Sequence, residues 1–154
     1  METSLWCEMV EIIKATRKHL YAITVLTREF FPYTNFNLDK IAQRLAEKDI
    51  EYYVAVVNKA TVGFVDIEFK DKQATILGLA VAREFQNKGI GSKLLQKALD
   101  RIAEKKCDEV LLLVSEDNLG ARKLYERFGF YFKGRLARRI WNKRILVFRK
   151  VLTP

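Results

Sequence analysis

The stretch ILGLAVAREFQNKGIGSKLL, residues 76–95, joins an apolar segment to an amphipathic one through a short loop with two glycines. Residues 74–81 are apolar on both faces of a strand, which is typical of a central strand covered on both sides. From residue 90 to about 103, apolar side chains recur every three or four positions and predict a helix with one buried face. A buried strand followed by a packed helix favours an α/β fold.

The loop at residues 86–92, Gln-Asn-Lys-Gly-Ile-Gly-Ser, has the composition of an anion-binding turn. Gly89 and Gly91 let the backbone approach a ligand closely, and the following helix presents unpaired N–H groups at its first turn. The side chains that can add donors are Asn87, Lys88 and Ser92. A dinucleotide-binding loop does not fit, because Leu94 stands in place of its third glycine. Two interpretations of this loop remain open. It binds phosphate groups in another geometry, or it is a tight strand-to-helix connection without a ligand.

A second informative stretch is NLGARKLYERFGF, residues 118–130. It predicts a helix over 118–128 that Gly129 closes as a left-handed cap. The apolar stripe of this helix consists of Ala121, Leu124 and Phe128. Tyr125 is expected beside this stripe, where a tyrosine is most often a packing residue at the edge of the core. A catalytic role for its hydroxyl is the alternative interpretation.

The rest of the chain alternates strand and helix patterns without an internal repeat or linker, which predicts a single domain over residues 1–154. Pro32 interrupts the first helix, and Asn37 is a candidate N-cap of the second. The expected strands are 10–14, 52–57, 62–69, 74–81, 110–114 and two within 131–152 that turn near Trp141-Asn142-Lys143. The expected helices are 18–30, 38–48, 90–106 and 118–128.

Charge is unevenly distributed along the chain, which has 28 basic and 19 acidic residues and a net charge of +9. Residues 131–154 hold eight basic side chains and no acidic one, so the first 130 residues carry a net charge of only +1. Such a segment either forms solvated outer strands or attracts an anion, such as an acidic substrate or a polyphosphate cofactor. Nucleic acid is not an expected partner, since no nucleic-acid motif accompanies the basic segment.

Other classes of protein are excluded by simple counts. The longest apolar run, 74–82, is far shorter than the roughly 20 residues of a membrane helix, and no signal peptide is expected. Two cysteines, Cys7 and Cys107, are too few for a disulfide framework and lack the spacing of a metal site. We therefore expect a reduced, cytoplasmic setting without a metal ion or a membrane, and we assign the only histidine, His19, to packing or to the surface.

Together, the strand, the Gln-x-x-Gly-x-Gly loop, the helix and the Asn-x-x-Ala-x-x-Leu-Tyr-Glu segment resemble the GNAT superfamily of acyl-CoA N-acyltransferases, in particular the N-terminal protein acetyltransferases. The likeness is specific over 76–130, and the element order agrees from about 10 to 152. It implies a GNAT fold, an α/β arrangement with a central, mixed, mostly antiparallel seven-stranded sheet flanked by about four helices. It also implies that the central strands splay apart after Val81, leaving a slot for the pantetheine arm.

The resemblance assigns roles to individual positions. Tyr125 matches the tyrosine that protonates the departing thiolate. The cofactor-binding residues implied for the strand, the pyrophosphate loop and the cofactor arm are Leu79, Ala80, Val81, Gln86, Asn87, Lys88, Gly89, Ile90, Gly91, Ser92 and Asn118. These positions imply an acetyl-CoA-dependent N-acetyltransferase that needs no metal and acts by direct attack of a primary amine. The acceptor expected is a protein N-terminus, and the protein is expected to be a monomer or a homodimer.

One departure from the family pattern leaves alternatives open. Leu113, Ala74 and Thr75 stand where many members carry a glutamate base. Asp66 and Glu68 share one face of a strand and Glu116 lies near the slot mouth, and we expect each of them to be a solvated carboxylate. A transferase for small-molecule amines, or a protein that binds acyl-CoA without turnover, therefore remains possible. Phe31, Pro32 and Tyr33 are candidate acceptor contacts, because the loop between the first two helices lines the acceptor site in the family.

Overall fold

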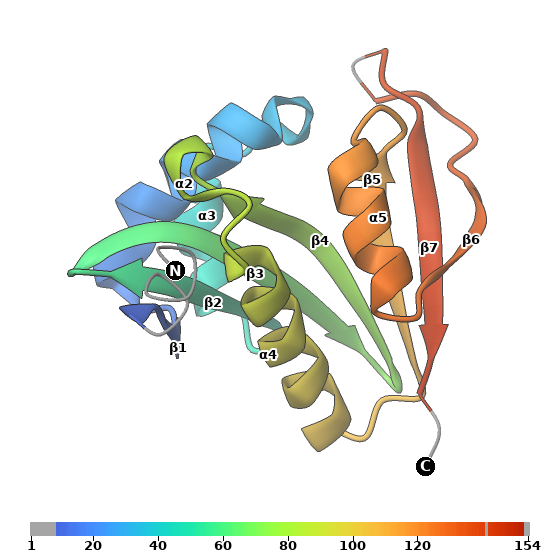
Figure 1. The fold of residues 1–154 in the computed structure, drawn as a ribbon, viewed down its shortest axis with the longest axis horizontal. Helices are drawn as coiled ribbons and strands as arrows, with labels where there is room; N and C mark the ends of the chain where they lie inside the picture. The colour runs from blue at the N-terminus through green and yellow to red at the C-terminus, as the bar shows by residue number, and fades with distance from the viewer. Residues whose placement is uncertain (1–8, 141, 153–154) are drawn as a thin grey trace.

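The computed structural model describes residues 9–140 and 142–152, which form one seven-stranded sheet with helices on both faces (Figure 1). The strands are β1 Glu11–Lys14, β2 Ile50–Val57, β3 Ala60–Lys70, β4 Gln73–Val81, β5 Glu109–Ser115, β6 Tyr131–Arg135 and β7 Ile145–Val151. Their order is β1-β2-β3-β4-β5-β7-β6, and every neighbouring pair is antiparallel except β4 with β5. The mixed, mostly antiparallel sheet expected from the sequence is confirmed.

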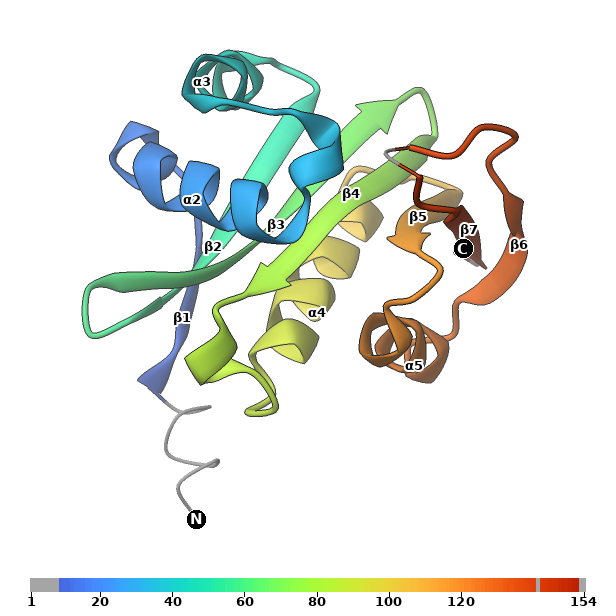
Figure 2. The same cartoon turned by 90° about the horizontal axis from the view of Figure 1, so that it is seen from above.

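Two pairs of helices cover the sheet (Figure 2). The helices are α2 Leu20–Phe30, α3 Leu38–Ala46, α4 Ile90–Glu104 and α5 Leu119–Arg127. The predicted N-cap of α3 is confirmed, since the Asn37 side chain accepts the backbone N–H of Lys40 at 2.8 Å. Across residues 9–140 and 142–152, no helix is both long and apolar enough to cross a membrane.

Each face of the sheet has its own apolar core, because neighbouring residues of a strand point to opposite sides. Tyr52 and Val54 of β2 pack toward α2 and α3, whereas Tyr53 and Ala55 pack toward α4. The helix residues buried on the α4 side include Leu94, Leu95, Ala98 and Ile102. The stripe predicted for this helix is therefore the stripe that it buries.

The sheet opens between β4 and β5, and this opening positions the candidate site (Figure 1). The two strands pair in parallel only from Gln73 with Glu109 to Ile76 with Leu112. The splay expected after Val81 thus begins five residues earlier. Its physical cause is a bulge, because Asp66 faces Gly78 and the next residue, Ile67, faces Ile76, which leaves one residue of β4 without a partner on β3.

The chain turns near residues 141–143 between the last two strands, as expected, although both strands end before they reach this turn. Residues 136–144 separate β6 from β7, with an isolated bridge between Ile140 and Lys143. Trp141, which the prediction placed in that turn, lies outside the described residues, as does Cys7. Cys107 is a buried free thiol.

Candidate active site

The glycine loop between β4 and α4 depends on a left-handed residue. Gly89 has a φ of 84° and is the N-cap of α4, a conformation that costs glycine little and other residues more. Because Gly89 has no side chain, it cannot cap the helix through one, and the first-turn N–H groups are left for another acceptor. The end of α4 therefore has the donors and the dipole that favour an anion.

Gln86 fixes the other end of this loop. Its side-chain Nε2 donates to the backbone carbonyl of Val81, the last residue of β4, at 2.9 Å. The loop is thus tied to the strand from which it leaves. Residues 78–80 pair with β3 on one edge and have no partner on β5 on the other, so that second edge of β4 is open.

Gly91 lies where three elements meet. A Cβ added to it would be 3.6 Å from Cδ2 of Leu124 on α5 and 4.0 Å from Cγ2 of Val81 on β4. The structure therefore brings the first turn of α4, the end of β4 and α5 together, as the two sequence motifs predicted. The side chains of Ala80 and Ile90 are buried in the core, so these two predicted positions can meet a ligand only through their backbones.

Tyr125 is the buried residue of α5, with 4% of its surface exposed. The expectation that it lies beside the apolar stripe is wrong, because its ring packs inward at centroid distances of 6.1 Å from Phe130 and 6.5 Å from Phe148. Burial raises the pKa of Tyr125, and the charges of Tyr33 and Asp66 raise it further. The phenol is therefore protonated at neutral pH, and its burial makes it a weaker acid than a solvated tyrosine.

Asn118 begins α5. Its side-chain oxygen accepts the backbone N–H of Ala121 at 3.1 Å, which is the geometry of an N-cap. The amide NH₂ group of Asn118 is free of this capping bond and can act toward a cofactor arm, which is the role that the resemblance implies.

A buried ion pair on the α2–α3 side of the sheet was not anticipated. Nη2 of Arg44 lies 2.7 Å from Oδ2 of Asp66, and its Nη1 lies 2.7 Å from Oε2 of Glu68. Nε of the same guanidinium donates to the hydroxyl of Tyr52 at 2.8 Å. Asp66 is 3% exposed, so the expectation of a solvated carboxylate is wrong for it. Glu68 has a 39% exposed side chain, and Glu116 is exposed.

The carboxylate of Asp66 lies against the bulge in β4. A Cβ added to Gly78 would be 2.9 Å from Oδ1 of Asp66 and 3.1 Å from Cε2 of Phe31. Only a residue without a side chain fits there unless its neighbours shift. Burial raises the pKa of Asp66 to about 6, although Arg44 and the backbone N–H of Gly78 oppose this shift. The sequence signal for this group was a pair of acids, Asp66 and Glu68, in the otherwise apolar strand β3 and an arginine on the inner face of α3.

Tyr33, a candidate acceptor contact, belongs to the same region. Its ring meets that of Phe31 edge-on at 6.3 Å. Burial raises the pKa of Tyr33, and the charges of Asp117 and Asp66 contribute to the shift. The connection between α2 and α3 therefore faces both the β4 bulge and the end of β5.

The basic C-terminal segment is partly neutralised by acids at the start of β5 and directly after it. Arg149 pairs with Glu109 and Lys143 pairs with Asp117, while Arg135 and Arg144 lie 3.5 and 3.7 Å from Glu116. A hollow of about 320 Å³ next to these pairs is lined by Ser115, Glu116, Asp117, Arg139, Asn142, Lys143 and Arg144. The positive electrostatic field of this segment is thus weaker than the number of its basic side chains suggests.

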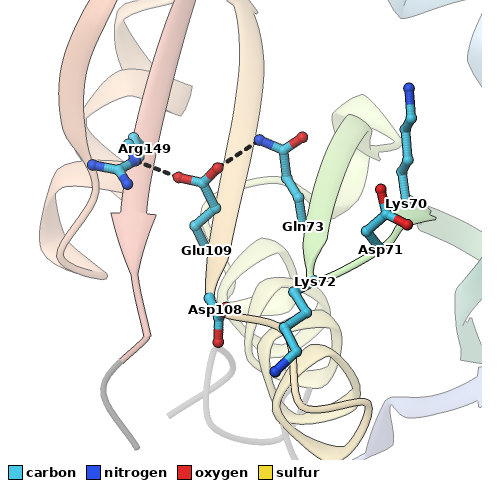
Figure 3. Close-up of a pocket in the computed structure, with 7 residues that line it drawn as sticks. All are labelled: Lys70, Asp71, Lys72, Gln73, Asp108, Glu109 and Arg149. Atoms are coloured by element: carbon cyan, nitrogen blue, oxygen red, sulfur yellow. Dashed lines mark hydrogen bonds and ion pairs between the residues drawn. The ribbon is translucent and has the colours of Figure 1, made fainter.

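A second hollow lies at the closed end of the β4–β5 opening (Figure 3). Within it, Glu109 accepts hydrogen bonds from Gln73 and from Arg149. The polar side chains in the middle of this hollow are thus bonded to one another, which is typical of a structural cluster. Among residues 9–140 and 142–152, no group of three or more potential ligands gathers as at a metal site.

Comparison with known proteins places these features in a family. The sequence model described as the Acetyltransferase (GNAT) family matches residues 16–130. The spermine/spermidine N(1)-acetyltransferase of Bacillus subtilis is 40% identical over 57 residues, which are 36% of this chain and 38% of that protein. The chain thus spans little more than a third of the length of this curated relative. N-alpha-acetyltransferase 30 of Schizosaccharomyces pombe is 29% identical over 153 residues, 95% of this chain and 99% of that protein.

Solved structures agree with the fold. Arabidopsis thaliana Naa50 in complex with the bisubstrate analogue CoA-Ac-MVNAL superposes with a TM-score of 0.79 at 25% identity. The match covers 94% of this chain and 99% of that one. The element order, the bulge in β4 and the glycine loop therefore occur within a fold that other proteins share over almost its full length.

Proposed function

This chain belongs to the acetyltransferase (GNAT) family, whose model matches 16–130, and from that premise we propose that it is an acetyl-CoA-dependent N-acetyltransferase. The observation that carries the proposal is the opening of the sheet between β4 and β5, together with the buried Tyr125 on α5, the helix that follows β5. The glycine loop lies at the end of the same β4 strand. A donor-rich helix end and a protonated phenol thus flank one opening.

The residues present fit acetyl-CoA as co-substrate. We assign its pyrophosphate to the first turn of α4, because Gly89 leaves those N–H groups uncapped by a side chain. The side chains assigned to the phosphates are Gln86, Asn87, Lys88 and Ser92. The backbone of 79–81 and the amide of Asn118 are assigned to the pantetheine arm.

The chemistry needs three contributions from the protein. A neutral amine has to attack the thioester carbonyl, an N–H group has to stabilise the oxyanion, and the departing thiolate has to receive a proton. Beyond Ile76, the backbone N–H groups of β4 that do not pair with β3 have no partner on β5 and can serve the oxyanion. Tyr125 is the proton donor in this proposal, since burial keeps it protonated at neutral pH.

We propose a protein N-terminus as acceptor. Relatives named for N-alpha-acetylation and for spermine acetylation are both similar to this chain, so a small-molecule amine is the second candidate. The absence of a glutamate at Leu113 favours a third, acyl-CoA binding without turnover. We further propose that the chain acts as a single domain in the cytoplasm, as a monomer or a homodimer, without nucleic acid.

An acetyl-CoA titration followed by a thiol-release assay tests this function. The amine panel consists of a Met-Asp-Glu peptide, a neutral peptide, spermidine and free amino acids. Saturable binding with thiol release on a peptide supports the proposal. Binding without release on any amine favours the non-catalytic alternative, and no binding removes acetyl-CoA from the assignment.

A further inference from the structure

One buried carboxylate lies at the point where β4 leaves β5. Asp66 on β3 is the register partner of Gly78, directly beside the bulge. Its Oδ2 is engaged by Arg44 at 2.7 Å, whereas its Oδ1 lies over the backbone of Gly78, next to ring atoms of Phe31 and Phe64. The oxygen that Arg44 does not engage is therefore the one against the opened stretch of β4.

Charged and titratable groups face Asp66 from each neighbouring element. Arg44 comes from α3, Tyr52 from β2 and Glu68 from its own strand. Tyr33, from the connection between α2 and α3, and Tyr125, from α5, both respond to its charge. Asp66 thus shares one electrostatic environment with the acceptor-side loop and with the proposed proton donor.

We propose that Asp66 accepts the proton of the attacking amine, with Arg44 and Tyr52 as positioning residues that hold its carboxylate against the β4 bulge. This role rests on the proposed acetyltransferase function and supplies the base that the sequence pattern lacks at Leu113, Ala74 and Thr75.

The proton transfers balance. The amine nitrogen forms a bond to the acetyl carbonyl carbon and gives one proton to Oδ1 of Asp66. The bond between that carbon and the sulfur of CoA breaks, and the sulfur takes one proton from the hydroxyl of Tyr125. Afterwards the carboxylic acid of Asp66 loses its proton to solvent, and the phenolate of Tyr125 regains one.

Other carboxylates near the opening are less suited to this role. Asp117 forms an ion pair with Lys143, which lowers the pKa of its carboxyl and makes it a weaker base. Glu116 is exposed and lies near two arginines. Asp66 combines a pKa near 6 with a position against the bulge, and a general base works best when its pKa is close to the operating pH.

The pH dependence of kcat in variants that keep Asp66 tests this proposal without touching the carboxylate. Arg44→Gln removes the cation that lowers the pKa of Asp66, so the acid limb of kcat should move to higher pH. Glu68→Gln removes an anion that raises this pKa, so the limb should move to lower pH. The matched control is Arg101→Gln, which loses an ion pair to the buried Glu51 and should leave the limb in place.

Asp66→Asn provides the second measurement. We expect kcat to fall by about 100-fold or more, with the calorimetric Kd for acetyl-CoA within about twofold of the wild-type value. The role of Asp66 as the base is supported if the acid limb of kcat shifts in opposite directions in Arg44→Gln and Glu68→Gln and kcat falls in Asp66→Asn. If the acid limb of kcat stays in place in both variants, or if Asp66→Asn keeps the wild-type kcat, Asp66 is not the base. Neither result contradicts the transferase function. A wild-type protein that acetylates no amine overturns the proposed function, and this role of Asp66 with it.

Discussion

Arg44 and Asp66 form a buried ion pair across two elements, with Nη2 and Oδ2 2.7 Å apart and side chains only 6% and 5% exposed. The pair joins α3 to β3 at the level of the β4 bulge. Tyr52 and Glu68 engage two further nitrogens of the same guanidinium. This cluster therefore couples α3 to β3 beside the point where β4 leaves β5.

Removing the arginine should destabilise the fold. In Arg44→Met the carboxylate of Asp66 stays buried without its partner, and breaking a buried pair in this way costs about 3–5 kcal/mol. The free energy of unfolding from urea titration measures the loss. Arg83→Met is the control, since it removes the exposed pair with Glu29 and should cost less than about 1 kcal/mol. Equal losses of unfolding free energy in the two variants would contradict the assignment of Arg44 and Asp66 as a stabilising buried ion pair.

Stability should also depend on the protonation of Asp66. Its pKa is about 6 in the fold, above the ordinary value of 3.8, so the folded state binds this proton more tightly than the unfolded state. The wild-type free energy of unfolding, relative to that of Asp66→Asn, should therefore decrease as pH rises from about 4 to about 6, by at most about 3 kcal/mol. Urea titrations of both proteins across this pH range measure the decrease. A difference in unfolding free energy that does not change with pH would exclude a raised pKa of Asp66.

Much of the fold could be predicted because it depends on local patterns. The stripe from Ile90 to Ile102, the cap at Asn37 and the left-handed Gly129, whose φ is 88°, are all settled by residues close in sequence. The onset of the opening could not be predicted, because the bulge after Ile76 depends on register between β3 and β4. Register follows from packing across strands and is not visible in one strand alone.

The candidate site also combines features that local sequence predicts with features that depend on tertiary contacts. The sequence makes the glycine loop and Tyr125 candidates because each lies in a short motif. Asp66 was assigned to solvent because an acid on a strand is most often exposed. Its partner Arg44 is 22 residues away on another element, and only the tertiary structure brings the two charges together.

The left-handed glycine of the loop, Gly89, should matter for the cofactor. Gly89→Ala places a Cβ on a residue with a φ of 84°, and the loop should relax away from the geometry that presents the α4 N–H groups. We expect calorimetry to give acetyl-CoA binding weakened by about tenfold, or about 1.4 kcal/mol. Gly120→Ala is the matched control, because a Cβ there meets nothing within 4 Å. Unchanged affinity in a folded Gly89→Ala would remove this loop from the cofactor site.

Loss of the Tyr125 hydroxyl should affect chemistry alone. Tyr125→Phe keeps the ring packing against Phe130 and Phe148, so the melting temperature and the acetyl-CoA affinity should change little. Without the proton donor we expect kcat to fall by about 100-fold or more. Single-turnover kinetics measure the chemical step directly. A rate within about twofold of wild type in that step would mean that the thiolate leaves without help from Tyr125.

Charge around the acceptor side should select among amines. Three of the cations near the end of β5 are partly neutralised by Glu116 and Asp117, but Arg138 and Arg139 add two more charges to the same connection. An amine on an acidic body should therefore have a higher kcat/KM than a polyamine, because like charges brought together cost free energy.

Steady-state kinetics with a Met-Asp-Glu peptide and spermidine at low and high salt test this selection. The preference for the peptide should shrink at high salt, since screening acts over about 3 Å at 1 M ionic strength and about 30 Å at 0.01 M. Arg139→Gln should reduce the preference at low salt, because its side chain lines the hollow beside β5. Lys59→Gln, in the β2–β3 turn, is the control and should leave it unchanged. If spermidine has the higher kcat/KM at both salt concentrations, the cations of 135–144 do not determine the acceptor, and the acids Glu116 and Asp117 become the groups that attract it.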